Sequence, residues 1–327
     1  MMAEDEAQKG TVAPEDKTAE EMTVIEWMEV FRKIYADVDS KRSPVEMWVA
    51  ATAHFTKLGE AIRSMHFSDL MKSAAHAFCW MCSFVLACQR EKGTVFALNE
   101  SFSDIVTCKY PLVCGHCRER SCHCNAPKMD SAEDKAASYE KLLEIRQGLY
   151  DAPDKYSVSR WRSTFKTIFG QNVHMLTLEA IGFHFLEEAG EELTALRGLK
   201  QLEHVLERQI EGIDDAFIEK LATYEGIVPL YRRHGGLKPE MHKSDPENIR
   251  NRLVIAKMDM FIEFADTFSW FCSILNKVES IAQNCKDNNC RLTQNAFLEK
   301  LMQEYLPDSS PACSSCRKCP CECVFYD

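Results

Sequence analysis

The feature that most constrains this chain is a cysteine spacing that occurs twice. CGHCRERSCHC begins at residue 114, CSSCRKCPCEC begins at residue 313, and both read C-x2-C-x4-C-x-C. Four thiolates so close in sequence can close on one tetrahedral ion, for which zinc is the usual occupant. We therefore expect two structural Zn²⁺ sites, with the ligands Cys114, Cys117, Cys122 and Cys124 in the first and Cys313, Cys316, Cys321 and Cys323 in the second. Cys319 is an extra thiol that could replace a ligand of the second site.

The predicted compartment supports metal binding by these cysteines. No apolar run reaches the roughly 18 residues that span a bilayer, and the acidic start MMAEDEAQKG is unlike a signal peptide. The sequence thus predicts a cytoplasmic protein with no membrane partner, where clustered cysteines are metal ligands rather than disulfides. A net charge of −11 argues against nucleic acid as the main partner.

Helical segments upstream of the two cysteine clusters also correspond to each other. The matched pairs are WMEVFRKIY (27–35) with WRSTFKTIF (161–169), KLGEAIR (57–63) with EAGEELT (188–194), and AHAFCWMCSFV (75–85) with ADTFSWFCSIL (265–275). We interpret the chain as a tandem duplication. Glycine and proline are few, at 13 and 11 residues, which favours helix throughout. The predicted fold is all-α, with two helical bundles packed as a pair within one chain and a small four-cysteine zinc knuckle after each bundle.

This interpretation divides the chain into six segments. They are a disordered acidic tail (1–20), a first helical repeat (21–106), its four-cysteine knuckle (107–126), a helical linker (127–155), a second repeat (156–290) with an insertion (198–255), and a C-terminal helix with the second four-cysteine knuckle (291–327). The insertion contains the basic loop YRRHGGLKPEMHK (231–243), which is either solvated or a lid that contacts phosphate.

An acidic stretch in the second repeat, FLEEAGEEL (185–193), carries four carboxylates in six positions. On a helical wheel Glu187, Glu188, Glu191 and Glu192 fall in one sector, opposite apolar residues. An ordinary solvated face explains this pattern as well as a binding site does.

A second acidic pattern lies in MDMFIEFADTFSWFCSIL (258–275), which is apolar nearly all round and therefore expected to be buried. Asp259, Glu263 and Asp266 share one face of this helix at i, i+4 and i+7. Buried carboxylates are unfavourable without a cation, and the stretch contains no Lys or Arg. A divalent ion with oxygen ligands, typically Mg²⁺, would satisfy both helices, whereas pairing with distant basic residues is the alternative.

The order E-E-x-G-E-E, then E-x-x-D, then F-x-W resembles the MazG-like members of the all-α nucleoside triphosphate pyrophosphohydrolases over residues 156–290. The resemblance implies a Mg²⁺-dependent hydrolase that converts a nucleoside triphosphate to a nucleoside monophosphate and pyrophosphate. It implies that the magnesium ligands are Glu188, Glu191, Glu263 and Asp266, and that catalytic carboxylates come from Glu187, Glu191 and Glu192.

The first repeat lacks most of this acidic pattern. In the alignment Lys57, Glu60, Ser73 and His76 stand at the positions of Glu188, Glu191, Glu263 and Asp266. One carboxylate cannot hold a magnesium–triphosphate complex, so we expect a catalytically silent partner. MazG-like bundles commonly pair as two subunits, so the resemblance implies that the tandem chain forms this pair internally, and a homodimer is a further possibility.

Two other functions are compatible with the sequence. A nucleotide-binding or sensing protein would keep the acidic site without turnover. An interaction protein would use the basic residues of the knuckles, Arg118 and Arg120 or Arg317 and Lys318, to contact a partner or nucleic acid. The sequence does not indicate which base or sugar a nucleotide ligand would carry.

Overall fold

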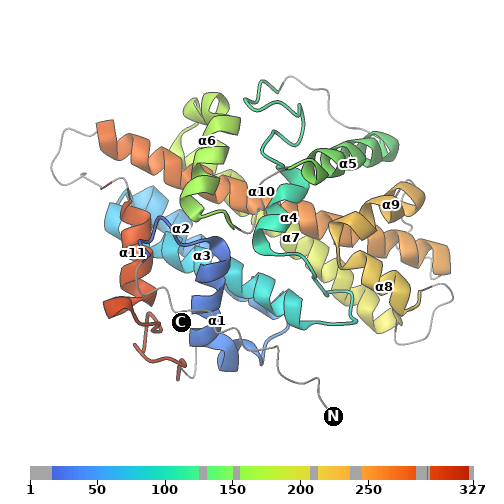
Figure 1. Ribbon diagram of the computed structural model, residues 1–327, viewed down its shortest axis with the longest axis horizontal. Helices are drawn as coiled ribbons and strands as arrows, with labels where there is room; N and C mark the ends of the chain where they lie inside the picture. The colour runs from blue at the N-terminus through green and yellow to red at the C-terminus, as the bar shows by residue number, and fades with distance from the viewer. Residues whose placement is uncertain are drawn as a thin grey trace, which may run out of the picture.

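The computed structural model describes residues 17–124, 131–149, 155–206, 213–235, 245–284, 293 and 295–323, and these are helical without a strand (Figure 1). The all-α prediction is confirmed. Residues 1–16 of the predicted tail and residues 236–243 of the basic loop lie outside the described residues. The helices are α1 (Val24–Asp39), α2 (Pro44–Ser64), α3 (Phe67–Arg90), α4 (Phe102–Lys109), α5 (Ala132–Gln147), α6 (Val158–His174), α7 (Leu178–Leu206), α8 (Asp215–Leu221), α9 (Tyr224–His234), α10 (Pro246–Asn284) and α11 (Ala296–Tyr305), followed by the 3-10 turn η3 (Pro307–Ser309).

The helix starts follow from local sequence. Thr23 caps α1 by accepting the backbone N–H of Glu26, whose carboxylate accepts the Thr23 N–H in return. Ser43 and Ser101 begin α2 and α4 with the same reciprocal pattern, and Ser157 accepts a backbone N–H at the start of α6. Each cap satisfies N–H groups that the first helical turn cannot pair internally. The boundaries of these helices are therefore readable from the sequence.

Equivalent elements of the two sequence repeats make equivalent contacts. Thr23 and Ser157, which precede the matched helices α1 and α6, form an antiparallel bridge. Helix α2 packs on α7, while α4 packs on α10 and α11 packs on α3 (Figure 1). The last helix of each repeat therefore packs against the other repeat.

The two cysteine loops cross over in the same way. The N–H of Cys122 donates to the carbonyl of Ile168 on α6 over 2.7 Å, and the N–H of Cys321 donates to the carbonyl of Ile34 on α1 over 2.7 Å. Ile34 and Ile168 are matched residues in the sequence alignment. Each cysteine loop is thus attached to the first helix of the opposite repeat.

The core lies between the long helices α3, α7 and α10. Aromatic side chains fill its centre, with Phe102 in edge contact with Phe264 at 5.1 Å and with Phe268 at 4.8 Å. Contrary to the sequence expectation, α3 is long and apolar enough by composition to cross a membrane. However, 78% of its most apolar window is buried inside the protein, as expected for a core helix.

The predicted linker and insertion are helical and pack together. Helix α5 lies within the linker segment and packs on α4 and α9. In the insertion, α7 continues to Leu206, α10 begins at Pro246, and α8 and α9 lie between them. Part of the basic loop is engaged here, because Arg232 pairs with Glu140 at 2.7 Å and His234 contacts Glu247 at 2.9 Å.

Candidate metal centres and acidic site

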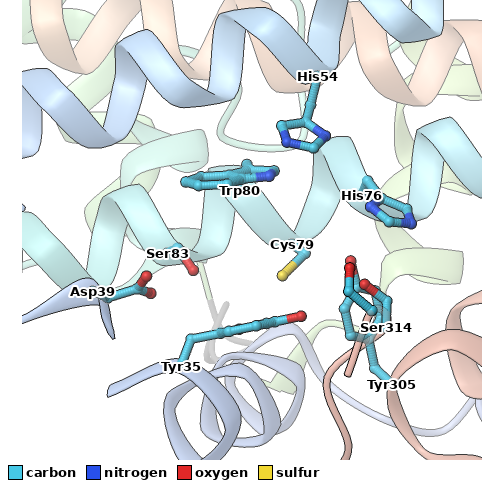
Figure 2. A pocket seen from close by; sticks show the side chains of 10 residues that line it. Tyr35, Asp39, His54, His76, Cys79, Trp80, Ser83, Tyr305 and Ser314 are labelled. Carbon is cyan, nitrogen blue, oxygen red and sulfur yellow. The ribbon is translucent and has the colours of Figure 1, made fainter. Parts of the chain in front are cut away.

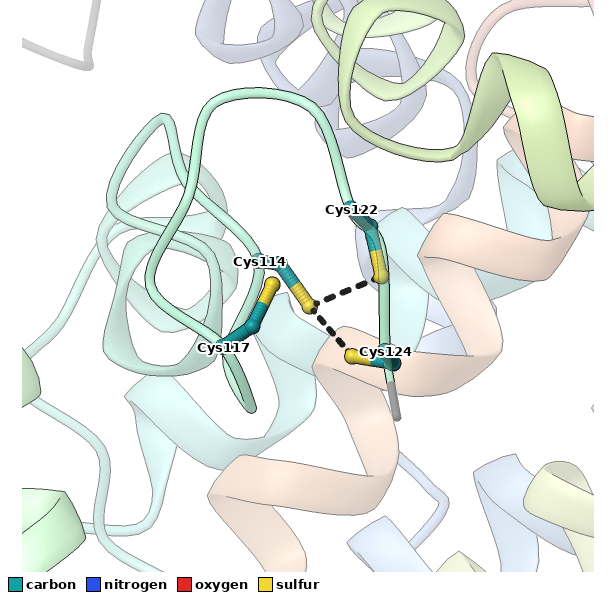
Figure 3. Close-up of side chains that lie close together, drawn as sticks. All are labelled: Cys114, Cys117, Cys122 and Cys124. Atoms are coloured by element: carbon teal, nitrogen blue, oxygen red, sulfur yellow. Dashed lines mark hydrogen bonds between the residues drawn. The ribbon is translucent and has the colours of Figure 1, made fainter. Parts of the chain in front are cut away.

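Both predicted cysteine sets form compact clusters. Sulfur–sulfur distances include 3.4 Å from Cys114 to Cys122 and 3.5 Å from Cys114 to Cys124 (Figure 3). In the second cluster, Cys313 lies 3.4 Å from Cys321. A disulfide would require about 2.05 Å, whereas two thiolates on one tetrahedral zinc ion lie about 3.8 Å apart. Each cluster could therefore hold a metal ion in a four-thiolate site, with the sulfur atoms within 4.8 Å of one another.

The extra thiol of the second loop lies outside its cluster, because the Cys319 sulfur donates to the carbonyl of Lys33 at 3.4 Å. Burial is the largest single effect on the pKa of Cys316 and raises it, but hydrogen bonds from the Glu322 and Lys318 backbone and from the neighbouring cysteines together outweigh burial and bring this pKa to about 6. The thiolate form, which is the metal-binding form, is thus favoured near neutral pH.

Three of the four basic residues of the cysteine loops have partners in the fold, whereas Arg120 is exposed. Arg118 donates to the Ser138 hydroxyl at 3.2 Å. The equivalent Arg317 donates to the carbonyl of Glu304 at 3.1 Å, and Lys318 pairs with Glu322. These contacts favour a structural role for the loops over a nucleic-acid surface.

Three of the predicted carboxylates meet between α7 and α10. Glu188 and Glu191 lie one turn apart on α7, and Glu263 faces them from α10. One oxygen from each lies within 4.8 Å of the others. The i, i+3 spacing on α7 and the close packing of α7 against α10 together create this acidic triplet.

The other two glutamates of the acidic stretch point elsewhere, so the expectation of a single acidic face is wrong. Glu187 is exposed and contacts His184 at 3.2 Å. Glu192 is fully buried, and neither of its carboxylate oxygens has a hydrogen-bond partner among the described residues. The four positions span about 140° of the helix, which is wide enough to reach from solvent to core.

Asp266 is held by two residues that precede the first cysteine cluster. Lys109 pairs with one carboxylate oxygen, and the Tyr110 hydroxyl donates to the other over 2.5 Å. Gly115 explains how the cysteine loop comes so close, because a Cβ there would lie 2.8 Å from the Lys109 carbonyl oxygen and 2.9 Å from its side chain. Asp266 therefore borders the acidic triplet but is neutralised by a lysine that sequence reasoning missed.

Crowding of carboxylates changes their protonation. Burial first, and then the neighbouring Asp266 and Glu188, raise the pKa of Glu263 to about 9 against the opposing charge of Lys109. Burial also raises the pKa of Glu188, and raises that of Glu192 well above its usual range. Burial lowers the pKa of Lys109, but the carboxylates around it more than reverse this effect. Burial and crowding thus favour the protonated carboxyls, although the ammonium groups of Lys109 and of the buried Lys257 oppose this effect at Glu263 and Glu192 respectively. A bound divalent cation would favour the ionised carboxylates further.

An open groove continues from the triplet on the side away from Asp266. Glu191 and Glu263 line it together with Asp259, and Lys135 and Arg252 provide two cations in the same groove. Burial raises the pKa of Asp259 to about 6. The groove combines carboxylate oxygens that could hold a metal ion with positive charge, and this combination suits a phosphate-bearing ligand.

The first repeat has no comparable acidic cluster among its described residues. Its one retained carboxylate, Glu60, is exposed on α2. His76, which stands at the position of Asp266, faces Glu304 at 4.0 Å, where the second repeat has Lys109 facing Asp266. In the two equivalent pairs the acidic and basic positions are therefore exchanged. Of the aromatic residues near the acidic motifs of the second repeat, Phe185 is buried, Phe183 is exposed and Trp270 is half-buried.

No protein family, curated protein or solved structure matches this chain. The resemblance to MazG-like hydrolases therefore depends on the acidic motifs in the sequence. The contribution of Lys109 and Tyr110 has no motif of its own, and only its position just before the first cysteine cluster could have drawn attention to it.

Proposed function

We propose that the protein is a Mg²⁺-dependent nucleoside triphosphate pyrophosphohydrolase. The observation that carries the proposal is the triplet of Glu188, Glu191 and Glu263, whose oxygens lie within 4.8 Å of one another. Ligands on opposite sides of Mg²⁺ lie about 4 Å apart, so small side-chain rotations suffice for coordination. The donor set is oxygen only, and the pKa of Glu263 is raised first by burial and then by the neighbouring carboxylates, which a bound cation would offset. These residues fit a hard divalent ion.

The chain's own residues would then position the substrate. A bound Mg²⁺ supplies charge neutralisation of the phosphate oxygens and a lowered pKa of water. Asp266, which borders the triplet, would complete the ligand set, and Lys109, which pairs with it, would supply positive charge beside the phosphates. Glu191, which is exposed at the triplet, is the best placed of the predicted acceptors for a water proton. Glu192 is fully buried, and burial raises its pKa well above the usual range, so its carboxyl is a poorer candidate than Glu191 for accepting a proton from water.

We infer that each four-cysteine cluster holds a structural zinc ion and that the two repeats form a MazG-like pair within one chain. Support for the zinc sites comes from the four-thiolate geometry, which leaves no open position for chemistry. Support for the pair comes from the crossed hydrogen bonds of Cys122 with Ile168 and of Cys321 with Ile34.

Pyrophosphate release tests the hydrolase proposal. The purified protein is incubated with Mg²⁺ and a panel of ribo- and deoxynucleoside triphosphates, and both products are identified. We expect a nucleoside monophosphate and pyrophosphate in equal amounts, with no reaction in the absence of divalent ion. Release of inorganic phosphate alone, or no product from any member of the panel, would reject the assignment.

A second function, nucleotide sensing without turnover, is favoured by one observation. The Lys109–Asp266 pair partly neutralises the acidic site without a metal ion, so the site is stable in a resting form. A sensor would bind Mg²⁺–nucleotide and release no pyrophosphate. Binding measured beside the hydrolysis assay separates the two functions.

A further inference from the structure

A cavity of about 270 Å³ lies between the first cysteine loop and helices α6 and α10. Glu188 and Asp266 line one end of it, so it opens beside the acidic triplet on the side away from the groove of Lys135 and Arg252. Its volume is just below the range of about 300–1,000 Å³ typical of pockets for whole drug-sized ligands. The cavity is therefore sized for part of a ligand, such as one planar ring system.

Two aromatic side chains line the cavity. Phe169 on α6 and Trp270 on α10 are both half-buried and line it. Each is held in place by a neighbour, since Trp270 stacks on His184 at 4.6 Å and Phe169 meets Tyr110 edge-on at 5.5 Å. Fixed aromatic faces beside a charged end suit a ligand with a flat uncharged ring and an anionic tail.

The cysteine loop forms a third wall. Cys114, Cys122 and Cys124 line the cavity, and the hydrogen bond from Cys122 to Ile168 ties the loop to α6. Asn172 reinforces this tie by donating to the Cys122 sulfur at 3.3 Å. Two hydrogen bonds to α6, together with the proposed four-thiolate metal site, would hold this loop in a fixed position.

The equivalent place in the first repeat is nearly filled. Tyr35 and Trp80 stand at the positions of Phe169 and Trp270, but they are only 2% and 5% exposed. Both line a pocket together with Cys79 and Tyr305 (Figure 2), and the volume of this pocket is only about 20 Å³. An empty cavity destabilises a folded protein. Because the large cavity is present beside the second repeat while the equivalent space in the first repeat is nearly filled, we take it to be a ligand site.

We propose that the cavity beside the first cysteine loop binds the nucleobase of the substrate, stacked on Phe169 and Trp270, while the acidic triplet engages the phosphates through Mg²⁺. The proposal rests on the proposed function for the identity of the phosphate end. It assigns to the first repeat a direct part in substrate recognition, because the cysteine loop, Lys109 and Tyr110 all come from that repeat.

The test compares binding of two probes in the presence of Mg²⁺. One set is the α,β-methylene nucleoside triphosphates, in which the bond to be cleaved is blocked, and the other is inorganic tripolyphosphate, which has no base. Leu176→Trp fills the cavity from its rim. Met175→Trp is the matched control, because Met175 is adjacent, 83% exposed and outside the cavity lining.

We expect Leu176→Trp to weaken nucleotide binding by at least about 10-fold, the scale of lost base stacking, with tripolyphosphate binding unchanged. Met175→Trp should change neither. Unchanged nucleotide binding by Leu176→Trp, or a wild-type protein that binds both probes equally, overturns the proposal. If Leu176→Trp loses both probes, Trp270→Leu decides: it must weaken nucleotide binding alone, and any other result overturns the proposal.

The outcomes also separate this inference from the hydrolase assignment. If the wild-type protein releases no pyrophosphate but Leu176→Trp selectively weakens nucleotide binding, the base pocket is supported and the hydrolase assignment is rejected. A protein that hydrolyses triphosphates with the wild-type KM in Leu176→Trp keeps the hydrolase and rejects the pocket.

Discussion

Lys109 at the end of α4 pairs with Asp266 in the middle of α10, and this contact joins the two sequence repeats at the acidic site. The lysine belongs to the repeat that lacks the acidic motifs. The first repeat, which keeps only one carboxylate of the acidic motifs, therefore still supplies a positive charge to the acidic site of the second repeat. The first repeat thus contributes a basic residue to this site instead of repeating its acidic residues.

Replacing this lysine should destabilise the fold. The Lys109 and Asp266 side chains are 16% and 8% exposed, so Lys109→Met leaves a buried carboxylate with only the Tyr110 hydroxyl. We expect the free energy of unfolding in metal-free buffer to fall by roughly 3 kcal/mol, measured by urea denaturation. Adding Asp266→Asn to Lys109→Met should recover most of the loss. Simple addition of the two single losses would show that the pair does not couple.

Glu191→Gln should damage turnover selectively. The change keeps the side-chain size but removes one charge from the acidic triplet. Mg²⁺ affinity and pyrophosphate release should both fall, with turnover about 100-fold lower, the scale of losing one transition-state charge contact. Glu60→Gln, the matched change in the first repeat, should leave turnover nearly intact because Glu60 is exposed and outside the triplet. Wild-type turnover in Glu191→Gln would remove this residue from the mechanism.

Metal analysis should find about two zinc ions per chain, because two four-thiolate clusters are present. Cys316→Ser should reduce this to about one. Cys319→Ser should keep both ions, since the Cys319 sulfur contacts the Lys33 carbonyl instead of the cluster. Strong chelation should lower the melting temperature, and an unchanged melting temperature after complete zinc removal would deny the clusters a structural role.

Acid should destabilise the first repeat through two histidines. His54 stacks on Trp80 at 5.1 Å and lies 5.9 Å from His76. Burial lowers the pKa of both rings to about 4, with Glu304 partly opposing the shift at His76. Below about pH 6.5 these histidines therefore bind protons in the unfolded chain but stay neutral in the folded chain. Their contribution to the free energy of unfolding is thus present at pH 7 and is lost as the pH drops toward 4.

The expected loss at pH 4.5 is roughly 2 kcal/mol for each histidine, measured as the change in unfolding free energy between pH 7.5 and 4.5. His54→Phe keeps an aromatic ring against Trp80 and removes one titrating group. Its loss of stability over the same range should be smaller than that of the wild type. An identical pH profile would show that His54 is not held neutral.

Neither repeat should fold independently. A chain limited to residues 21–126 lacks α7 and α11, which cover α2 and α3. It would expose Trp48, whose indole N–H donates to the Ala189 carbonyl at 2.9 Å, and Phe55, which packs against Phe185. We expect this fragment to be insoluble or self-associated in size-exclusion chromatography. A monomer that unfolds cooperatively would contradict the crossed packing.

Local signals in the sequence predict much of this structure. The caps at Thr23 and Ser43 mark helix starts, and the repeated cysteine spacing places four sulfur atoms together in each loop. The i, i+3 spacing of Glu188 and Glu191 was enough to put them on one face of α7. These features depend on chemistry within a few residues, which a sequence displays directly.

Contacts between distant segments were not predictable in the same way. Nothing near Lys109 indicates that it meets Asp266, because the contact depends on how α4 crosses α10. The burial of Glu192 was also missed, since a helical wheel gives angles but not the depth of the neighbouring helix. The acidic positions were visible from the sequence, while their separate environments were set by packing.

The crossed attachment of the cysteine loops affects how the protein can be made. Ile34 on α1 receives its hydrogen bond from Cys321, which lies at the far end of the printed sequence. During synthesis, Tyr35 and the adjoining apolar face of α1 stay uncovered until the second cysteine loop has left the ribosome and can pack on α1. Translation at roughly 5–20 residues per second makes this interval tens of seconds. Newly made chains should therefore depend on chaperones during this period, and on zinc being available when the second loop emerges.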